Sequence, residues 1–335
     1  MRKITYVQAI NEALHQMMEK DSRVFIIGVG VNSPWYVGKS TIGLYDRFGD
    51  DRVIDTPVAE NGITGVAIGA SLAGMRPVII HPRMDFMYLA MDQIINHAAN
   101  WHYMFGGKVN VPVTIRGIIN RGGEQAAQHS QSIQSMLMQV PGLKVVMPST
   151  PYEAKGLLIA SILDNNPVVY IDDRWLYELE GEVPEEVYAL PIGKGIVRKA
   201  GKDVTVIATS YMVLEANKAS EILEEEGIDV EIIDLRSLKP LDDQIILESV
   251  EKTGRVVVVD GTWKTAGTAS EVCAIITCNN VFNKLKAPVI RVTLPDTPAP
   301  ASSSLEKVYY PDAHSIVSAV KKLCVNINNS GGKKK

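Results

Sequence analysis

Short runs of β-branched residues alternate with longer stretches of helical period along most of the chain. Such runs, bounded by polar or glycine-containing turns, are typical of buried parallel strands, and the stretches between them are typical of crossover helices. The predicted strands are 24–29, 77–81, 111–116, 143–147, 167–172, 204–208, 230–233, 256–259 and 289–292. The predicted helices are 62–73, 88–104, 132–139, 152–164, 213–226, 243–253 and 266–277. The pattern therefore predicts an α/β protein built on parallel sheets.

Local signals add detail at the start of two helices. Residues 1–18 begin with basic residues, but Glu12 and His15 interrupt the apolar positions, so we predict an amphipathic helix rather than a signal peptide. Ser149-Thr150-Pro151 combines a capping hydroxyl with a proline in the first turn, which predicts that a helix starts there.

A second series of strands and helices begins near Asp203, which indicates two domains. We predict a first domain at 1–180, a glutamate-containing linker at 181–202 and a second domain at 203–325. The last segment, 326–335, reads NINNSGGKKK; it is polar and glycine-containing, which predicts a disordered tail.

Composition and charge narrow the class of protein. The 335 residues include 34 Lys and Arg against 38 Asp and Glu, a net charge of −4, which argues against a protein that binds nucleic acid through a basic surface. The three cysteines form no CxxC pair, so neither a disulfide framework nor a zinc site is expected. No apolar run is long enough to span a membrane. We therefore expect a soluble, cytoplasmic protein with no nucleic-acid or membrane partner.

Glu60 is the first candidate for chemistry, since it stands at the start of a helix rich in small residues. Gly62, Gly65, Gly69 and Gly74 each lower helix stability by roughly 1 kcal/mol, and close approach of another helix or subunit is the usual reason to keep them. Glu60 is either an acid favoured by a helix N-terminus or a carboxylate that holds a heterocycle nitrogen. Local sequence leaves both readings open.

His129 is the second candidate because it lies in a polar loop that follows a buried strand. Histidine changes its charge near neutral pH, so a role in proton transfer competes with that of a surface histidine. The histidines at 15, 81, 97, 102 and 314 lack such a setting. The sequence contains no G-x-G-x-x-G after its first strand, no P-loop, no H-E-x-x-H and no G-x-S-x-G, which disfavours the nicotinamide, nucleotide and hydrolase classes.

Several longer segments occur in a recognisable order. They are DRVIDTPVAENGITGVAIGASLAGMRPV, MDQIINHAA, AAQHSQ, PGLKVVMPSTPYEAKGLL and DNNPVV, then VEIIDLRSLKPLD, EKTGRVVVVD and APVIRVTLPDTPAP. Over residues 1–325 the chain resembles the beta subunit of the first component of the 2-oxo acid dehydrogenases, of pyruvate, branched-chain and acetoin type, in the transketolase-like superfamily. The resemblance implies two parallel-sheet domains: a transketolase-like pyrimidine-binding domain followed by a transketolase C-terminal domain.

The resemblance also implies a cofactor and partners. Members of the family use thiamine diphosphate; the beta subunit holds its pyrimidine, and an alpha subunit holds its diphosphate through Mg²⁺. The alpha-type signature, Gly-Asp-Gly followed by Asn, is absent, since Gly49-Asp50-Asp51 does not match it. The expected assembly is an α₂β₂ heterotetramer that oxidatively decarboxylates a 2-oxo acid and passes the acyl group to lipoyl on an acyltransferase core.

Site residues follow by motif. The resemblance implies that Glu60 bonds the pyrimidine nitrogen, that Phe86 stacks on the ring and that His129 lies beside the substrate. It also implies a potassium site, as in some relatives. Its expected ligands are Val113, Ser161, Ile162, Asp164 and Asn166.

Three departures from the family pattern bear on the substrate. The usual Gly-Glu-Asp-Val reads Gly28-Val29-Gly30-Val31, and HPRMDF at 81–86 places Arg83 and Asp85 where Phe-Met-Thr-Phe-Asn-Phe is common. Arg121-Gly122-Gly123-Glu124-Gln125 replaces smaller residues. These changes indicate a substrate more polar than pyruvate. Two alternatives stay open: the C-terminal subunit of a split transketolase-like enzyme that transfers a two-carbon ketol unit, and a scaffolding paralogue without activity.

Overall fold

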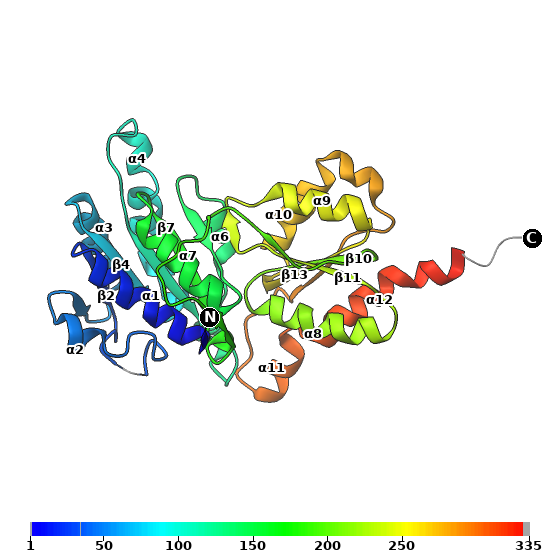
Figure 1. Ribbon diagram of the computed structural model, residues 1–335, viewed down its shortest axis with the longest axis horizontal. Helices are drawn as coiled ribbons and strands as arrows, with labels where there is room; N and C mark the ends of the chain where they lie inside the picture. The colour runs from blue at the N-terminus through cyan, green and yellow to red at the C-terminus, as the bar shows by residue number, and fades with distance from the viewer. Residues whose placement is uncertain (1, 34, 331–335) are drawn as a thin grey trace, which may run out of the picture. The chain divides into compact units, whose positions relative to one another are not determined.

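Parallel strands form the centre of both units into which the chain divides (Figure 1). The computed structural model describes residues 2–33 and 35–330, with side chains described up to residue 324. The first unit comprises the residues up to Gly193 together with Ser237–Pro240, and the second comprises Lys194–Arg236 and the residues from Leu241 onward. Mixed α/β architecture with mostly parallel sheets confirms the predicted fold class.

The first unit contains a seven-stranded sheet in the order β12-β6-β7-β5-β4-β2-β3. All neighbouring strands are parallel except β12, which is antiparallel to β6. The strands are β2 (Val24–Gly28), β3 (Val53–Asp55), β4 (Arg76–His81), β5 (Thr114–Ile119), β6 (Lys144–Val146), β7 (Val168–Asp173) and β12 (Ser237–Lys239). Strands β2, β5 and β7 are buried along their whole length, as strands covered on both faces should be.

The helices of the first unit connect these strands. They are α1 (Tyr6–Lys20), α2 (Leu44–Phe48), α3 (Glu60–Leu72), α4 (Trp101–Met104), α5 (Ala126–His129), α6 (Gln134–Met138) and α7 (Pro151–Leu163), with the 3₁₀ helices η1 (Met84–Ala90) and η3 (Arg174–Leu176) and the π-helix η2 (Asp92–Ala98). Helix α1 packs on α7 (Figure 1), and β1 (Arg2–Thr5) pairs with β8 (Glu180–Val183). The Thr150 hydroxyl accepts from the Glu153 N–H at 3.4 Å, which confirms the predicted start of α7.

The chain reverses its direction of travel across this sheet at β2. From β2 it passes to β3 on one side, and α3 then carries it back to β4 on the other side. In open α/β sheets, ligands bind outside the carboxyl ends of the strands at such a switch point. The residues that follow β2, β3 and β4 therefore occupy the position where a binding site is expected.

Two glycines at the end of β2 allow neighbouring segments to pack closely against it. A Cβ at Gly28 would lie 2.4 Å from the carbonyl oxygen of Ile80 on the neighbouring strand. Gly30 has φ +68°, and a Cβ there would lie 2.5 Å from the ring of Tyr36. The Gly30 N–H donates to the Asp55 carboxylate at 2.6 Å, which ties the end of β2 to the end of β3.

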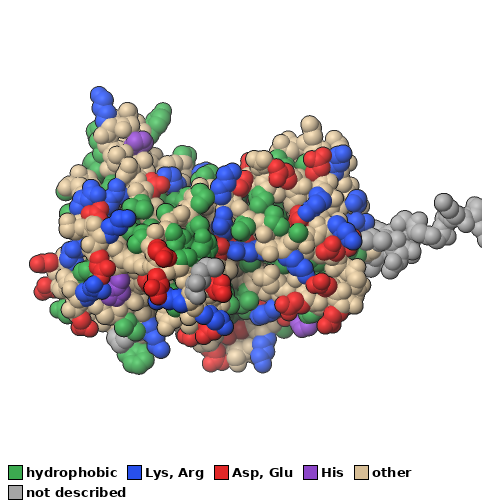
Figure 2. Space-filling view, viewed as in Figure 1, with side chains coloured by type: hydrophobic (Ala, Val, Ile, Leu, Met, Phe, Trp, Pro, Cys, Tyr) green, Lys and Arg blue, Asp and Glu red, His purple; other side chains and the backbone are tan. Residues whose placement is uncertain are grey.

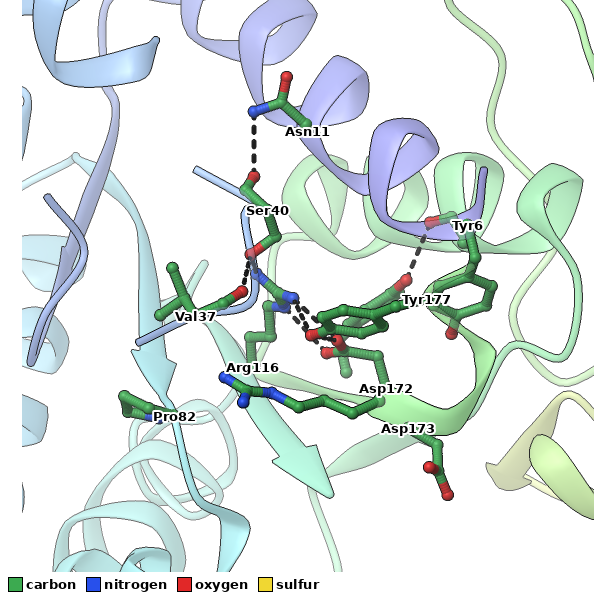
Figure 3. A network of polar contacts seen from close by, with 12 residues as sticks. Tyr6, Asn11, Val37, Ser40, Pro82, Arg116, Asp172, Asp173 and Tyr177 are labelled. Atoms are coloured by element: carbon green, nitrogen blue, oxygen red, sulfur yellow. Dashed lines mark hydrogen bonds and ion pairs between the residues drawn. The ribbon is translucent and has the colours of Figure 1, made fainter. Parts of the chain in front are cut away.

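A fully buried ion pair joins the middle strands of the sheet (Figure 3). Arg116 on β5 donates from Nε and Nη2 to the two carboxylate oxygens of Asp172 on β7, each at 2.8 Å. Its Nη1 donates to the Ser40 hydroxyl at 2.7 Å, and the Tyr177 hydroxyl donates to Asp172 at 2.6 Å. Asn11 on α1 in turn donates to the Ser40 carbonyl at 3.1 Å. The pair therefore links two strands, a loop and a helix.

The second unit has a five-stranded sheet in the order β14-β13-β10-β11-β9, with only β9 antiparallel to its neighbour. Its strands are β9 (Ile196–Lys199), β10 (Val204–Ala208), β11 (Val230–Asp234), β13 (Val256–Trp263) and β14 (Ile290–Leu294). Its helices are α8 (Tyr211–Glu225), α9 (Asp243–Thr253), α10 (Thr268–Thr277), η4 (Asn280–Lys284), α11 (Ser303–Tyr309) and α12 (Ala313–Ser330). A buried core joins α8 and α12 to strands of this sheet.

Three predicted segments differ from the structure. The single helix at 88–104 is divided into parts of η1, η2 and α4. The linker at 181–202 contains most of β8, which pairs with β1 in a separate two-stranded sheet, and all of β9, which belongs to the five-stranded sheet. Helix α12 continues through residues 326–330 of the predicted disordered tail, while 331–335 lie outside the described residues.

The close approach at Gly28 leads to a test of the switch-point geometry. We expect Gly28→Ala to lower the free energy of unfolding by about 1–3 kcal/mol, because the added methyl group meets a strand carbonyl that cannot move alone. The matched control is Gly69→Ala on the exposed side of α3, which has open space and should raise stability by about 0.5–1 kcal/mol. Urea unfolding of both variants measures the difference, and equal effects at the two positions would contradict the interpretation.

Candidate functional site

A cavity of about 180 Å³ lies at the switch point of the first unit. Its walls come from the segments that follow β2 and β3 and from the end of β4 with η1. The lining residues are Val29, Tyr36, Val58, Glu60, Ile63, Ile80, His81, Pro82, Arg83, Phe86 and Leu89. A larger hollow of about 740 Å³ in the second unit is lined by none of the predicted site residues. We therefore take the smaller cavity as the candidate site.

Glu60 is the first residue of α3 and is 8% exposed. The positive end of a helix dipole favours a carboxylate at this position. The Thr64 hydroxyl donates to the Glu60 carbonyl oxygen at 2.7 Å, and the N-cap residue Ala59 makes no side-chain capping hydrogen bond. The residue thus fits both readings that the sequence left open: it is an acid at a helix N-terminus, and it lines a cavity.

Phe86 and His129 lie against each other beside the same cavity. The Phe86 ring lines the cavity, and the His129 ring meets it edge to face, with centroids 5.4 Å apart and an interplanar angle of 80°. Asp85 accepts from the Gln131 N–H at 2.9 Å, which fastens the loop that carries His129 to η1. The three predicted site residues are therefore brought together, Glu60 and Phe86 on one cavity and His129 against Phe86.

The loop before His129 has an unusual backbone. Glu124 and Ala126 have φ values of +62° and +57°, a left-handed conformation that costs non-glycine residues of order 1–3 kcal/mol each. Gly122 and Gly123 on the same loop have positive φ as well. Such strain persists where surrounding contacts fix the backbone, and it is concentrated at functional sites.

His81 is a cavity residue that sequence reasoning missed. It is the last residue of β4, is 1% exposed, and its Nε2 lies 3.4 Å from the Thr64 hydroxyl. Because that hydroxyl donates to the Glu60 carbonyl, it accepts from Nε2–H, and Nδ1 has no partner among the described residues. Burial lowers the pKa of His81 to about 4, so the ring is neutral at pH 7. Its position at the carboxyl end of a buried strand was the available signal.

The three charged residues that depart from the family pattern occupy different environments. Arg83 is half-buried and lines the cavity. Asp85 is buried, and burial raises its pKa. Arg121 pairs with the buried Asp173 at 2.6 Å and lies over the Trp175 ring at 5.6 Å. Of the two arginines, only Arg83 lines the cavity, while Arg121 pairs with a carboxylate of the scaffold.

The predicted potassium ligands gather around the end of α7. Arg76 donates from Nη1 to the carbonyl oxygens of Ile162 and Asp164, each at 2.9 Å. The Asp164 carboxylate pairs with Lys144 at 2.5 Å and accepts from the Asn166 N–H at 2.9 Å. A guanidinium and an ammonium group therefore already contact this cluster.

The remaining two predicted ligands also have partners. The Ser161 hydroxyl donates to the Leu157 carbonyl at 2.7 Å, and the Val113 carbonyl accepts from the Val168 N–H at 3.1 Å. The Asn166 side-chain oxygen is buried without a hydrogen-bond partner among the described residues. Potassium at this cluster stays a prediction.

The surface charge and the helix lengths can be compared with two predictions from the sequence, that the protein does not bind nucleic acid and does not span a membrane. Acidic and basic side chains are interspersed on the face drawn in Figure 2, and the described part of that face has no continuous patch of one sign. Within residues 2–33 and 35–330, no helix has the length and apolar character needed to cross a membrane.

Comparison with known families assigns the two units. A family model of the transketolase pyrimidine binding domain matches residues 2–178, and one of the transketolase C-terminal domain matches residues 193–316. A solved structure titled split gene transketolase, inactive beta4 tetramer, superposes with a TM-score of 0.77 at 24% identity, covering 96% of this chain and 98% of that chain. The two matched domain families indicate a transketolase-type component of a thiamine-diphosphate-dependent enzyme.

Curated relatives narrow the class. The acetoin:2,6-dichlorophenolindophenol oxidoreductase subunit beta of Cupriavidus necator is 45% identical, with 96% of this chain and 97% of the relative covered. The pyruvate dehydrogenase E1 component subunit beta and the 2-oxoisovalerate dehydrogenase subunit beta of Bacillus subtilis are 43% and 42% identical, each with 96% and 99% covered. The chain belongs to the family of 2-oxo acid dehydrogenase E1 beta subunits. The resemblance seen in the sequence is confirmed, and these relatives favour it over the split-transketolase alternative.

The buried His81 leads to a pH prediction. An unfolded histidine has a pKa near 6.5, whereas folded His81 has a pKa of about 4, so between these values the unfolded chain binds more protons. The contribution of neutral His81 to the free energy of unfolding is therefore fully present above pH 6.5. It is lost as the pH drops from 6.5 toward 4, by about 3 kcal/mol.

His81→Phe removes this titration while keeping an aromatic ring. We expect the variant to lose less stability than the parent chain between pH 6.5 and 4.5, as measured by urea unfolding. Parallel loss of stability in the two proteins over that interval would show that His81 is not neutral when folded.

Proposed function

We propose that this chain is the beta subunit of an enzyme that oxidatively decarboxylates a 2-oxo acid, using thiamine diphosphate shared with an alpha subunit, and passes the acyl group to lipoyl. The observation that carries the proposal is the arrangement at the switch point, where Glu60 and Phe86 line one cavity and His129 packs against Phe86. Its similarity to beta subunits over nearly the whole chain supports the reaction class.

The cavity fits the pyrimidine part of the cofactor. A buried carboxylate can accept a hydrogen bond from a ring nitrogen, and Glu60 provides one at the cavity wall. Phe86 offers an aromatic face for stacking, while Ile63 and Ile80 cover apolar edges. When bound, thiamine diphosphate supplies the electron sink for decarboxylation. The role of Glu60 is to hold the proton on the pyrimidine nitrogen, and that of Phe86 is to fix the plane of the ring.

We assign to His129, the last residue of α5, a role at the substrate rather than at the pyrimidine ring. It is partly exposed beside the cavity, on a loop fastened through Asp85, so its imidazole is accessible and held in position. A histidine in this setting can donate a hydrogen bond to a developing oxyanion or move a proton during acyl transfer. The positive φ values of Glu124 and Ala126, just before His129, are of the kind that persists only where surrounding contacts hold the backbone.

The partner is expected on the exposed face of α3. Gly62, Val66, Gly69 and Ala73 recur at helical spacing on this side of the helix and are exposed, and Val58 just before it is 71% exposed. Small side chains allow a second backbone to approach closely, which accounts for glycines that lower helix stability. We infer that an alpha subunit, which would hold the diphosphate with Mg²⁺, covers this face in an α₂β₂ assembly. Potassium at the end of α7 and a lipoylated acyltransferase core belong to the same proposal.

Glu60→Gln tests the site. We expect turnover of 2-oxo acids by the assembled complex to fall by several orders of magnitude, roughly 10²–10⁴-fold, because the neutral amide cannot hold the ring proton. Thermal unfolding of the chain should change little. Glu19→Gln, on an exposed carboxylate at the end of α1, is the matched control. Near-parental turnover in Glu60→Gln, or turnover of ketose phosphates in place of 2-oxo acids, would contradict the proposal.

Val66→Arg tests the partner surface. Val66 is 60% exposed, so the isolated chain should fold normally, but an arginine on the small-residue face should reduce association with a co-expressed alpha chain by at least about tenfold. The matched control is Val308→Arg, since Val308 is 81% exposed on α11 of the second unit. Size-exclusion chromatography with mass spectrometry of the co-purified chain measures assembly. Equal assembly of both variants would place the alpha subunit elsewhere.

A further inference from the structure

The arginines beside the site differ in what balances their charge. Arg121 pairs with the buried carboxylate of Asp173 at 2.6 Å. Arg83 and Arg174 have no carboxylate oxygen within 4.0 Å among the described residues. Both follow the carboxyl ends of strands, Arg83 after β4 and Arg174 after β7, and one strand, β5, lies between these two in the sheet. Two uncompensated guanidinium groups therefore stand at the edge where the cavity opens.

Among the residues that the structure describes, neutral oxygens hold Arg83 in place. Its Nη1 donates to the Pro82 carbonyl at 3.0 Å. With the Asn120 amide oxygen turned toward it, Nη2 and Nε donate to that oxygen at 3.2 and 3.3 Å. These contacts orient the guanidinium without cancelling its charge. Because Arg83 also lines the cavity, that charge faces the space next to Glu60 and Phe86.

Arg174 brings a second positive charge to the same side. Its Nη2 donates to the carbonyl oxygen of Tyr36, which is itself a cavity residue, and its Nε is buried without a hydrogen-bond partner among the described residues. Arg174 therefore contacts a residue that lines the same cavity as Arg83. Burial lowers the pKa of Arg83, and the charge of Arg174 lowers it further. An arginine remains charged in proteins all the same.

Asp85 is the carboxylate that interacts electrostatically with Arg83. It does not neutralise the charges of Arg83 and Arg174. One of its oxygens accepts from the Gln131 N–H at 2.9 Å, and the other is buried without a partner among the described residues. Burial raises the pKa of this carboxyl, which weakens it as a counter-charge. A carboxylate brought by a ligand would meet two guanidinium groups and a fork-shaped set of donors.

We propose that Arg83 and Arg174 bind a second carboxylate of the substrate, so that the enzyme acts on 2-oxo dicarboxylic acids. This inference rests on the proposed function and names its substrate class. The carboxylate next to the keto group leaves as neutral carbon dioxide, so a cation that stabilised it would favour the ground state over the transition state. Arginines at the site are therefore expected to bind a different carboxylate, one that the reaction leaves unchanged.

Pairs of 2-oxo acids of equal chain length, one with and one without a second carboxylate, distinguish the effect of charge from that of size. The assembled α–β complex is assayed with 2-oxoglutarate against 2-oxovalerate, and with 2-oxoadipate against 2-oxohexanoate, using an artificial electron acceptor. We expect kcat/KM to favour the dicarboxylate in each pair. Arg83→Gln and Arg174→Gln should each reduce that preference by about 10–100-fold, the usual effect of losing one hydrogen bond to a charged group. Arg83→Lys should keep part of the preference, and Arg47→Gln, on a surface arginine of α2, all of it.

Binding without turnover gives a second readout. Calorimetry with the unreactive acids glutarate and valerate on the complex should show tighter binding of glutarate, and the same variants should remove the difference. A parental complex that prefers the monocarboxylates, with Arg83→Gln unchanged, would overturn this inference and leave the proposed function standing. Dissociation of the alpha subunit from Arg83→Gln would overturn it too, because the arginine would then pair with the partner. Turnover of ketose phosphates but of no 2-oxo acid would overturn both.

Discussion

The buried pair of Arg116 and Asp172 is the interaction on which the first unit depends. Two fully buried charges are stable only when they are matched in geometry and when their remaining donors and acceptors are satisfied. Both conditions are met, since Arg116 donates two hydrogen bonds to Asp172 and one to Ser40, and Asp172 also accepts one from Tyr177 (Figure 3). Burial opposes the charge on Arg116, yet Asp172 and Tyr177 raise its pKa, so the guanidinium stays charged.

The two residues after Asp172 differ in what they contact: Asp173 pairs with an arginine of the scaffold, and Arg174 contacts a residue of the cavity. Asp172 and Asp173 are both buried, and each compensates an arginine of β5 or of the loop after it. Arg174, the next residue, has no such acid and reaches the Tyr36 carbonyl at the cavity. Because the strand that carries the ion pair ends at Asp173, its geometry fixes where the charge of Arg174 is placed. An aspartate that pairs with an arginine of the scaffold is thus directly followed by the arginine proposed to bind the substrate.

Much of the fold was predictable because it repeats a regular physical pattern. Buried strands such as β2 and β13 contain runs of four apolar residues, and the capped start of α7 has both a hydroxyl and a proline. The short strands β3, β9 and β12 escaped notice because a few residues on the edge of a sheet carry little periodicity. The 88–104 segment is helical in composition, but it changes its hydrogen-bonding register twice, which tertiary packing decides.

The site was predictable in part. Glu60, Phe86 and His129 were found from a family resemblance, and local sequence alone did not distinguish Glu60 from a helix-capping acid. His81 was passed over although it ends a predicted strand, because the sequence does not show that this strand ends at a cavity. The sequence also does not show whether a carboxylate compensates Arg83 or Arg121, since the carboxylate that pairs with Arg121 comes from a different strand. Local signals identify residue types, whereas compensation of charge depends on the assembled sheet.

The switch point at β2 also has a consequence for the order of folding. The residues around the cavity come from segments that are distant in sequence and meet only when β2, β3 and β4 have paired and α3 has crossed between them. Contacts of this long range form late, because loop closure must precede them. A partly folded chain can therefore contain native helices and still lack any surface for the cofactor. Binding of the cofactor would then report that these three strands and α3 have assembled.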